Sequence, residues 1–321
     1  MKALIDFEDA PVISIPARDG YPGFSACEGI LVEGPQGWGA FCPPPAGDDL
    51  AAARWLTSAI EGGTVGWPDP VRGRVAVAAA VPAVGPQNAA AIASASGCAA
   101  ADVRVTGQPG DGARLEAVRG ALGADGAIRC VVEAPWDVDT AARLIPVLDR
   151  AAGGLQFVQQ PCATAAELAT LRRRVDVPVA VDVSGLSADG LTLPEVADIA
   201  VLTVGPLGGV RRALRFAERS DLPCVVSAAA GASESSIGLA GGLALAGALP
   251  EVAFACGLGT AASLAGDVVS PGRVLIPVDG HLPVAPMAPA PDAARVAEFT
   301  LADAERVAWW RRRLIAAKEL L

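Results

Sequence analysis

The sequence predicts an α/β protein built on a (β/α)8-type barrel, and two observations carry this prediction. From about residue 72 onward, short runs rich in Val, Ile and Ala recur roughly every 22 to 28 residues, the size of one strand–helix unit. Each run is followed by a stretch with helical apolar periodicity, as in 165–175 and 210–220. A barrel needs eight such units. The expected strands are 74–81, 102–106, 128–132, 155–159, 177–182, 199–204, 223–227 and 252–256.

An open, doubly wound sheet is the structural alternative. Even spacing of the units and the lack of a phosphate-binding glycine fingerprint favour the barrel. Residues 1–71 differ, because they read as a short antiparallel sheet followed by one helix. The segment 272–321 contains several prolines and then a helix through 301–318. We therefore expect an α+β capping domain at 1–71, a barrel at 72–271, and a C-terminal segment at 272–321 that returns to the cap.

Composition limits the partners of this chain. Hydrophobic residues make up 52% of the 321 residues and charged residues 19%, which predicts a large core. The net charge of −10 argues against nucleic acid or an anionic membrane surface. The seven cysteines are scattered and form no CxxC pair, so neither a zinc site nor a disulfide framework is expected. No signal-peptide or membrane-spanning segment is found. We expect a cytoplasmic protein that takes a small molecule as its partner, and an oligomer stays open.

Several segments together carry a resemblance to a known family. They are VQQPCAT (158–164), LRRRVDVPVAVD (171–182), IAVLTVGPLGG (199–209), CGLGT (256–260) and VDGHLPV (278–284). The chain resembles an actinobacterial o-succinylbenzoate synthase of the enolase superfamily. That resemblance implies a modified barrel with an N-terminal α+β cap completed by the C-terminal tail. It also implies Mg²⁺ held by acidic residues at the ends of the third, fourth and fifth barrel strands, and lysines at the ends of the second and sixth.

Most of these implied residues are replaced. Arg104 stands in place of the catalytic lysine of the second strand, and Thr203 in place of the lysine of the sixth. Of the three implied metal ligands, only Asp182 is kept, since Val131 and Gln159 occupy the other two positions. An arginine stays protonated at neutral pH and is a poor base, and one carboxylate with one amide is a poor Mg²⁺ site. We therefore expect no metal and no cofactor.

The replacements define a set of candidate site residues. As catalytic residues we expect Glu133 as acid or base, Arg104 as a clamp for an anion, and Asp182 as an ion-pair partner of Arg104. Glu133 is equally compatible with a solvated carboxylate at the rim. The substrate-binding candidates lie in the cap loop, at strand ends, or in the loop after the seventh strand: Tyr21, Val131, Gln159, Val183, Thr203, Glu234 and Ser235. The only histidine, His281, is expected to be structural.

Three functions remain open from the sequence. The first is a metal-independent enzyme that uses this barrel for cyclisation, elimination or isomerisation of a small, largely apolar substrate, in a biosynthetic pathway. The second is a pseudoenzyme that binds a ligand or a partner protein. The third is a true o-succinylbenzoate synthase or N-acylamino acid racemase, with a metal site rebuilt from Glu133, Gln159 and Asp182. The first is our preferred hypothesis, because the framework segments are intact while the site positions are rewritten.

Overall fold

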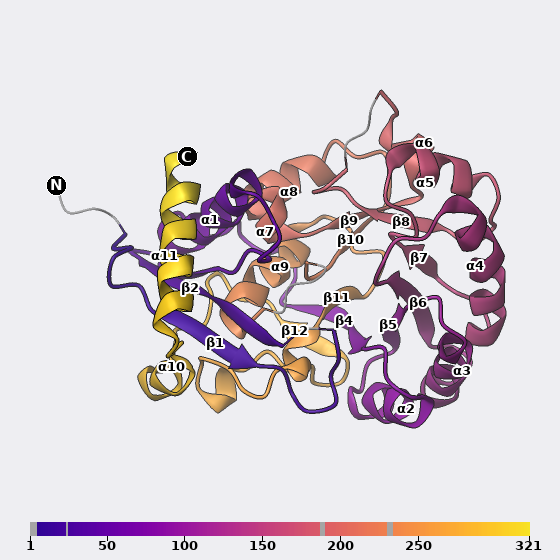
Figure 1. The fold of residues 1–321 in the computed structure, drawn as a ribbon, viewed down its shortest axis with the longest axis horizontal. Helices are drawn as coiled ribbons and strands as arrows, with labels where there is room; N and C mark the ends of the chain where they lie inside the picture. The colour runs from indigo at the N-terminus through magenta and orange to yellow at the C-terminus, as the bar shows by residue number, and fades with distance from the viewer. Residues whose placement is uncertain (1–4, 24, 187–189, 230–233) are drawn as a thin grey trace.

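The barrel predicted from the sequence is present in the computed structural model, which describes residues 5–23, 25–186, 190–229 and 234–321. Its eight parallel strands form one sheet in the order β10-β9-β8-β7-β6-β5-β4-β11 (Figure 1). They are β4 (Arg74–Val81), β5 (Ala100–Val105), β6 (Ala127–Val132), β7 (Phe157–Gln159), β8 (Val179–Asp182), β9 (Ile199–Leu202), β10 (Cys224–Val226) and β11 (Cys256–Gly259).

The two ends of this sheet meet and nearly close the ring. Ser227 and Gly257 form a parallel bridge just beyond β10, and the backbone N–H of Ala228 donates to the carbonyl of Gly257 at 2.9 Å. Because the strands are parallel, their carboxyl ends open on one side of the barrel. The polar residues discussed below lie at this side.

Helices connect successive strands and cover the outside of the barrel. They are α2 (Pro86–Ala95), α3 (Gly110–Leu122), α4 (Val138–Ala152), α5 (Ala165–Arg172), α6 (Leu193–Val196), α7 (Val204–Leu207), α8 (Val210–Ala217) and α9 (Ser236–Ala248). Local signals explain their ends: the Thr164 and Glu167 side chains form a capping box at the start of α5, and α4 ends at Gly153 with φ of 64°. The glycines after α7, Gly208 and Gly209, likewise have positive φ values of 83° and 116°, which glycine adopts without strain.

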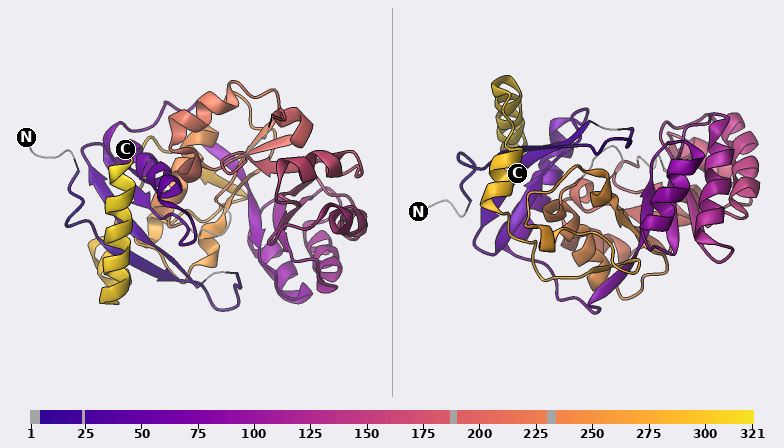
Figure 2. Two further views of the ribbon diagram at one scale, coloured as in Figure 1. Left: turned by 45° about the horizontal axis from the view of Figure 1, so that its top comes forward. Right: turned by 90° about the horizontal axis from the view of Figure 1, so that it is seen from below.

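The N-terminal residues form the expected capping domain. Its antiparallel sheet consists of β1 (Val12–Pro16), β2 (Ala26–Gly34) and β3 (Gly37–Phe41), followed by α1 (Asp49–Thr64). The C-terminal segment contributes α10 (Ala293–Phe299) and α11 (Ala304–Glu319), and α11 packs against α1. Figure 2 shows α11 in yellow beside the indigo strands of the cap. Helix α9 lies between cap and barrel, which explains why it is apolar on all sides and almost wholly buried.

One expected strand is displaced. The sequence placed the eighth barrel strand at 252–256, but it forms at Cys256–Gly259. The physical reason is close packing against β4. A Cβ atom on Gly259 would lie 2.4 Å from the carbonyl oxygen of Ala78, so only glycine fits there. The eighth strand therefore forms in the segment CGLG, which lacks the apolar run that identified the other strands.

The remaining short elements lie after the barrel. These are the 3-10 turns η1 (Thr260–Ser263) and η2 (Pro271–Arg273), and β12 (His281–Pro283), which pairs antiparallel with β4. His281 is exposed on β12, opposite Ala76 near the amino end of β4 and away from the carboxyl ends of the strands. Within the described residues, no helix is long and apolar enough to cross a membrane.

Candidate active site at the barrel mouth

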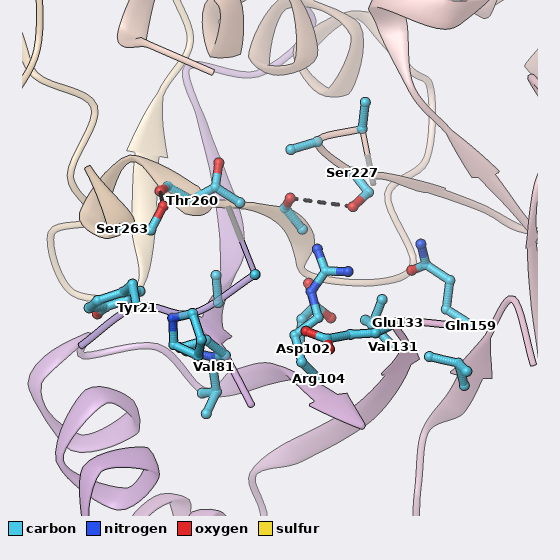
Figure 3. Close-up of a pocket in the computed structure, with 18 of the residues that line it drawn as sticks. Tyr21, Val81, Asp102, Arg104, Val131, Glu133, Gln159, Ser227, Thr260 and Ser263 are labelled. Atoms are coloured by element: carbon cyan, nitrogen blue, oxygen red, sulfur yellow. Dashed lines mark hydrogen bonds between the residues drawn. The ribbon is translucent and has the colours of Figure 1, made fainter. Parts of the chain in front are cut away.

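A cavity of about 450 Å³ opens at the carboxyl ends of the barrel strands, and we call it the main cavity (Figure 3). Much of its wall is apolar, with alanine, valine and proline side chains from β4, β6 and the loop after β10. A loop of the cap, residues 21–23, covers one side of it. The polar side chains that line it are Tyr21, Asp102, Arg104, Glu133, Gln159, Ser227, Thr260 and Ser263.

The strand register sorts the inward-facing residues into two layers. Arg104, Val131 and Gln159 are direct partners across β5, β6 and β7, and form the layer nearer the mouth. Asp102, Arg129 and Phe157 are partners on the same strands, two residues earlier, and form the layer beneath. Side chains two residues apart on a strand share a face, so both layers point into the barrel.

The lower layer contains a buried ion pair. Arg129 is fully buried, and its Nε lies 2.6 Å from Oδ1 of Asp102. Its Nη1 donates to the carbonyl of Ala255 at 2.6 Å, and its guanidinium lies 5.1 Å from the centroid of the Phe157 ring. Asp102 therefore contributes a carboxylate to the cavity floor whose charge is already balanced by Arg129.

The upper layer contains a guanidinium without such a partner. Arg104 reaches into the main cavity (Figure 3), and among the described residues its side chain takes part in no hydrogen bond or ion pair. Glu133 is exposed at the rim, where a Cβ atom on Gly23 of the cap loop would lie 3.6 Å from its Oε1. Gln159 is buried, with 6% of its surface exposed, and also lines the main cavity. A small molecule bearing an acidic or carbonyl oxygen could bind Arg104 directly.

Asp182 does not pair with Arg104, and this part of the sequence-based expectation is wrong. Its Oδ1 accepts hydrogen bonds from the Ser184 backbone N–H at 2.9 Å and the Ser184 hydroxyl at 2.6 Å. The Thr203 hydroxyl donates to the same carboxylate at 3.1 to 3.2 Å. Burial raises the pKa of Asp182, although these hydrogen bonds oppose the increase. Local donors thus satisfy the carboxylate where we expected a distant cation.

The other expected site residues divide into two groups. Tyr21, Val131 and Gln159 line the main cavity, and burial raises the pKa of the Tyr21 phenol. Thr203 is buried and bonded to Asp182, Val183 packs against the barrel core, and neither lines the cavity. Glu234 and Ser235 do not line the main cavity, and Glu234 lines a separate, smaller cavity. Ser235 is fully buried at the start of α9.

Sequence reasoning missed four polar residues of the lining: Asp102, Ser227, Thr260 and Ser263. Asp102 could have been found, since it lies two residues before Arg104 and therefore shares its face of the strand. Thr260 and Ser263 follow the strand whose position we misjudged. Gln160 was also missed: at a φ of 52° its side chain accepts from the Asp182 backbone N–H and donates to the carbonyl of Cys162, both at 3.2 Å. It fixes the end of β8.

The residues at the implied Mg²⁺ site do not fit that ion. Val131 offers no ligand atom, Gln159 offers a neutral amide, and the Asp182 carboxylate is directed to Ser184 and Thr203. Mg²⁺ prefers several oxygen ligands, with carboxylates among them. Across the described ranges, no three His, Cys, Asp or Glu side chains are grouped as a metal site would require.

Comparisons with known proteins agree with this architecture. Two family descriptions match, "Enolase C-terminal domain-like" over residues 86–289 and "Enolase N-terminal domain-like" over residues 12–63. Among solved structures, muconate lactonizing enzyme from Pseudomonas fluorescens superposes with a TM-score of 0.75, at 18% identity, covering 92% of this chain and 98% of that one. At that identity the likeness shows the fold.

Relatives with higher identity are enzymes named o-succinylbenzoate synthase. The protein from Thermobifida fusca is 48% identical over 313 residues, which cover 95% of this chain and 94% of the relative. The protein from Mycolicibacterium smegmatis is 40% identical, with 97% and 95% covered. This chain therefore belongs to the o-succinylbenzoate synthase family of the enolase superfamily.

Proposed function

We propose that this chain is a lyase- or isomerase-type enzyme that acts without a divalent metal ion on a small, largely apolar organic molecule. Its relationship to o-succinylbenzoate synthases supports the lyase or isomerase class. One observation carries the finer proposal. The cavity presents the guanidinium of Arg104, for which the described residues supply no hydrogen bond or ion pair, in the layer where Val131 and Gln159 occupy two implied metal positions.

The proposed chemistry uses residues that reach the cavity. Arg104 binds a carboxylate or carbonyl oxygen of the substrate and stabilises negative charge that develops on it during the reaction. Glu133, at the rim beside the cap loop, moves a proton to or from the substrate. Asp182 has no part in these steps, because its oxygens bind Ser184 and Thr203. The alanine and valine walls exclude water and hold the substrate in a reactive conformation, which suits cyclisation, elimination or isomerisation.

The first prediction concerns Arg104 and uses o-succinylbenzoate, the compound in the relatives' name, as the probe. We expect R104A to weaken probe binding about 10- to 100-fold, because a hydrogen bond to a charged group contributes about 1.5–3 kcal/mol. Isothermal titration calorimetry in EDTA measures this. The control R143A removes an exposed arginine of α4 and should leave affinity unchanged. Equal affinities of wild type and R104A would remove the basis of the proposal.

A second candidate function is o-succinylbenzoate synthase itself, through a rebuilt metal site. The observation that favours it is the 48% identity to the Thermobifida fusca enzyme along nearly the whole chain. A direct assay for o-succinylbenzoate formation, with Mg²⁺ and with EDTA, separates the two candidates. Turnover that requires Mg²⁺ would establish the second candidate and end the first.

The second prediction restores the missing ligands. Val131 and Gln159 are adjacent across β6 and β7 and both face the cavity, so the double variant V131D/Q159E places two carboxylates side by side. We expect it to bind Mn²⁺ at least about tenfold more tightly than wild type, equivalent to ~1.4 kcal/mol. Electron paramagnetic resonance of free Mn²⁺ measures the bound fraction. Saturable, tight Mn²⁺ binding by the unaltered protein would contradict metal independence.

A further inference from the structure

A second, much smaller cavity lies behind the wall of the main cavity, between the barrel and the cap. Its volume is about 30 Å³, room for roughly two water molecules. Residues of α1 and α9 make up half of its lining, and Trp55, Trp67 and Glu234 line it as well. We call it the small cavity. In the described part of the chain, Ser227 is the one residue that lines both cavities.

Glu234 lies in the small cavity, where little would balance the negative charge of its ionised carboxylate. The carboxyl accepts a hydrogen bond from the backbone N–H of Ala229, and burial raises its pKa to about 7. Its Oε1 would lie 3.0 Å from a Cβ atom on Gly238, so the glycine of α9 makes room for it.

The groups around Glu234 supply no cation among the described residues. From the cap, the nearby titratable group is the Cys42 thiol, whose pKa is raised by its hydrogen bond to Cys27, by burial and by Glu234. On α1, the next carboxylate along the helix, Glu61, pairs with Arg211 of α8 at 3.1 Å. The lining residues from α7, α9 and β11 carry no charge. With no described cation beside it, the Glu234 carboxyl avoids an unbalanced charge by binding a proton.

Ser227, which Figure 3 shows among the residues of the main cavity, also lines the small cavity. Its recorded hydrogen bond to the carbonyl of Gly257 is long, at 3.4 Å. A Cβ atom on Gly257 would lie 2.5 Å from Ser227 Oγ and 2.7 Å from Asp102 Oδ2. Because Gly257 has no side chain, both oxygens can lie close to its backbone. The hydroxyl therefore adjoins the carboxylate floor of the main cavity on one side and the small cavity of Glu234 on the other.

We propose that Ser227 is a ligand-binding residue of the main cavity and that Glu234 acts through it as a positioning residue, by setting the direction of the single Ser227 hydroxyl proton. Neutral Glu234 donates to Ser227, directly or through water in the small cavity, and Ser227 then donates to an oxygen of the ligand. Ionised Glu234 accepts a hydrogen bond from the Ser227 hydroxyl and so withdraws that donor from the ligand. The proton gained or lost by the Glu234 carboxyl exchanges with solvent, and no other covalent bond changes. This inference rests on the proposed function in requiring a ligand oxygen in the main cavity.

The test is the pH dependence of affinity for o-succinylbenzoate between pH 6 and 8, measured by calorimetry. We expect affinity to fall about tenfold across this range, the contribution of one hydrogen bond. S227A should bind with little pH dependence. E234Q should bind at pH 8 as wild type does at pH 6, because its amide can donate to Ser227 throughout. S58A removes the other serine of the small cavity, which does not reach the main cavity, and should keep the wild-type pH dependence. His281, the only histidine of the chain, lies exposed on β12 and lines neither cavity.

A measurement without ligand keeps this inference separate from the proposed function. In protein labelled with ¹³C at glutamate carboxyls, we expect one resonance with a midpoint near pH 7 that is absent in E234Q and shifts its midpoint in S227A. If the probe does not bind, the proposed function is wrong, but this titration still tests whether Glu234 and Ser227 interact. An unchanged midpoint in S227A, or pH-dependent probe affinity that persists in S227A, would overturn it.

Discussion

Replacing Arg129 with Met is expected to lower the free energy of unfolding by about 3–5 kcal/mol, the usual result of removing one partner from a buried ion pair. Arg129 is fully buried, and Asp102 beside it has 17% of its side chain exposed. Without the guanidinium, the Asp102 carboxylate keeps its burial and loses its cation. The carbonyl of Ala255 loses a donor as well. Urea unfolding followed by circular dichroism measures the loss.

Two further variants make this prediction specific. R174M removes an arginine from an ion pair of similar length, 2.7 Å, to Asp139, but those side chains are 44% and 87% exposed. Its expected cost is below about 1 kcal/mol. The double variant D102L/R129M removes both charges and should recover part of the loss, because no unpaired carboxylate remains. If R129M costs no more than R174M, the lower layer of the barrel is better hydrated than its burial indicates.

Much of the fold could be predicted because the barrel repeats one physical pattern. Buried parallel strands are continuous apolar runs, and β4 and the start of β9 coincide with such runs. The prediction failed at β11, where the determining fact is the distance from Gly259 to the backbone of Ala78, a contact between residues far apart in sequence. Periodicity along a chain contains no information on such an approach.

The site was predicted less completely, for a related reason. Strand-end positions identified Arg104, Val131 and Gln159 correctly as cavity-lining residues, since a strand end fixes where a side chain points. Which groups bind one another depends on loop paths. The Ser184 backbone after β8 turns back to Asp182, and the described end of the loop after β10 places Glu234 behind the wall. Neither path has a sequence signal that we recognised.

The burial of Glu234 also predicts how stability depends on pH. Its pKa rises from an ordinary value of 4.5 in the unfolded chain to about 7 in the folded protein. Between these values the folded state binds more protons than the unfolded state, so stability falls as the pH increases. A difference of this size corresponds to about 3 kcal/mol, fully available below pH 4.5 and lost as the pH passes 7.

E234Q should remove this pH dependence, since an amide does not titrate. We expect the variant to match wild type near pH 4.5 and to exceed its free energy of unfolding by about 3 kcal/mol at pH 8. Urea unfolding at a series of pH values gives the comparison. E251Q, which alters an exposed glutamate between α9 and β11, is the control and should follow wild type. Parallel curves for wild type and E234Q would mean that Glu234 is ionised in both states, and that the small cavity holds a charge that water or the Ala229 N–H stabilises.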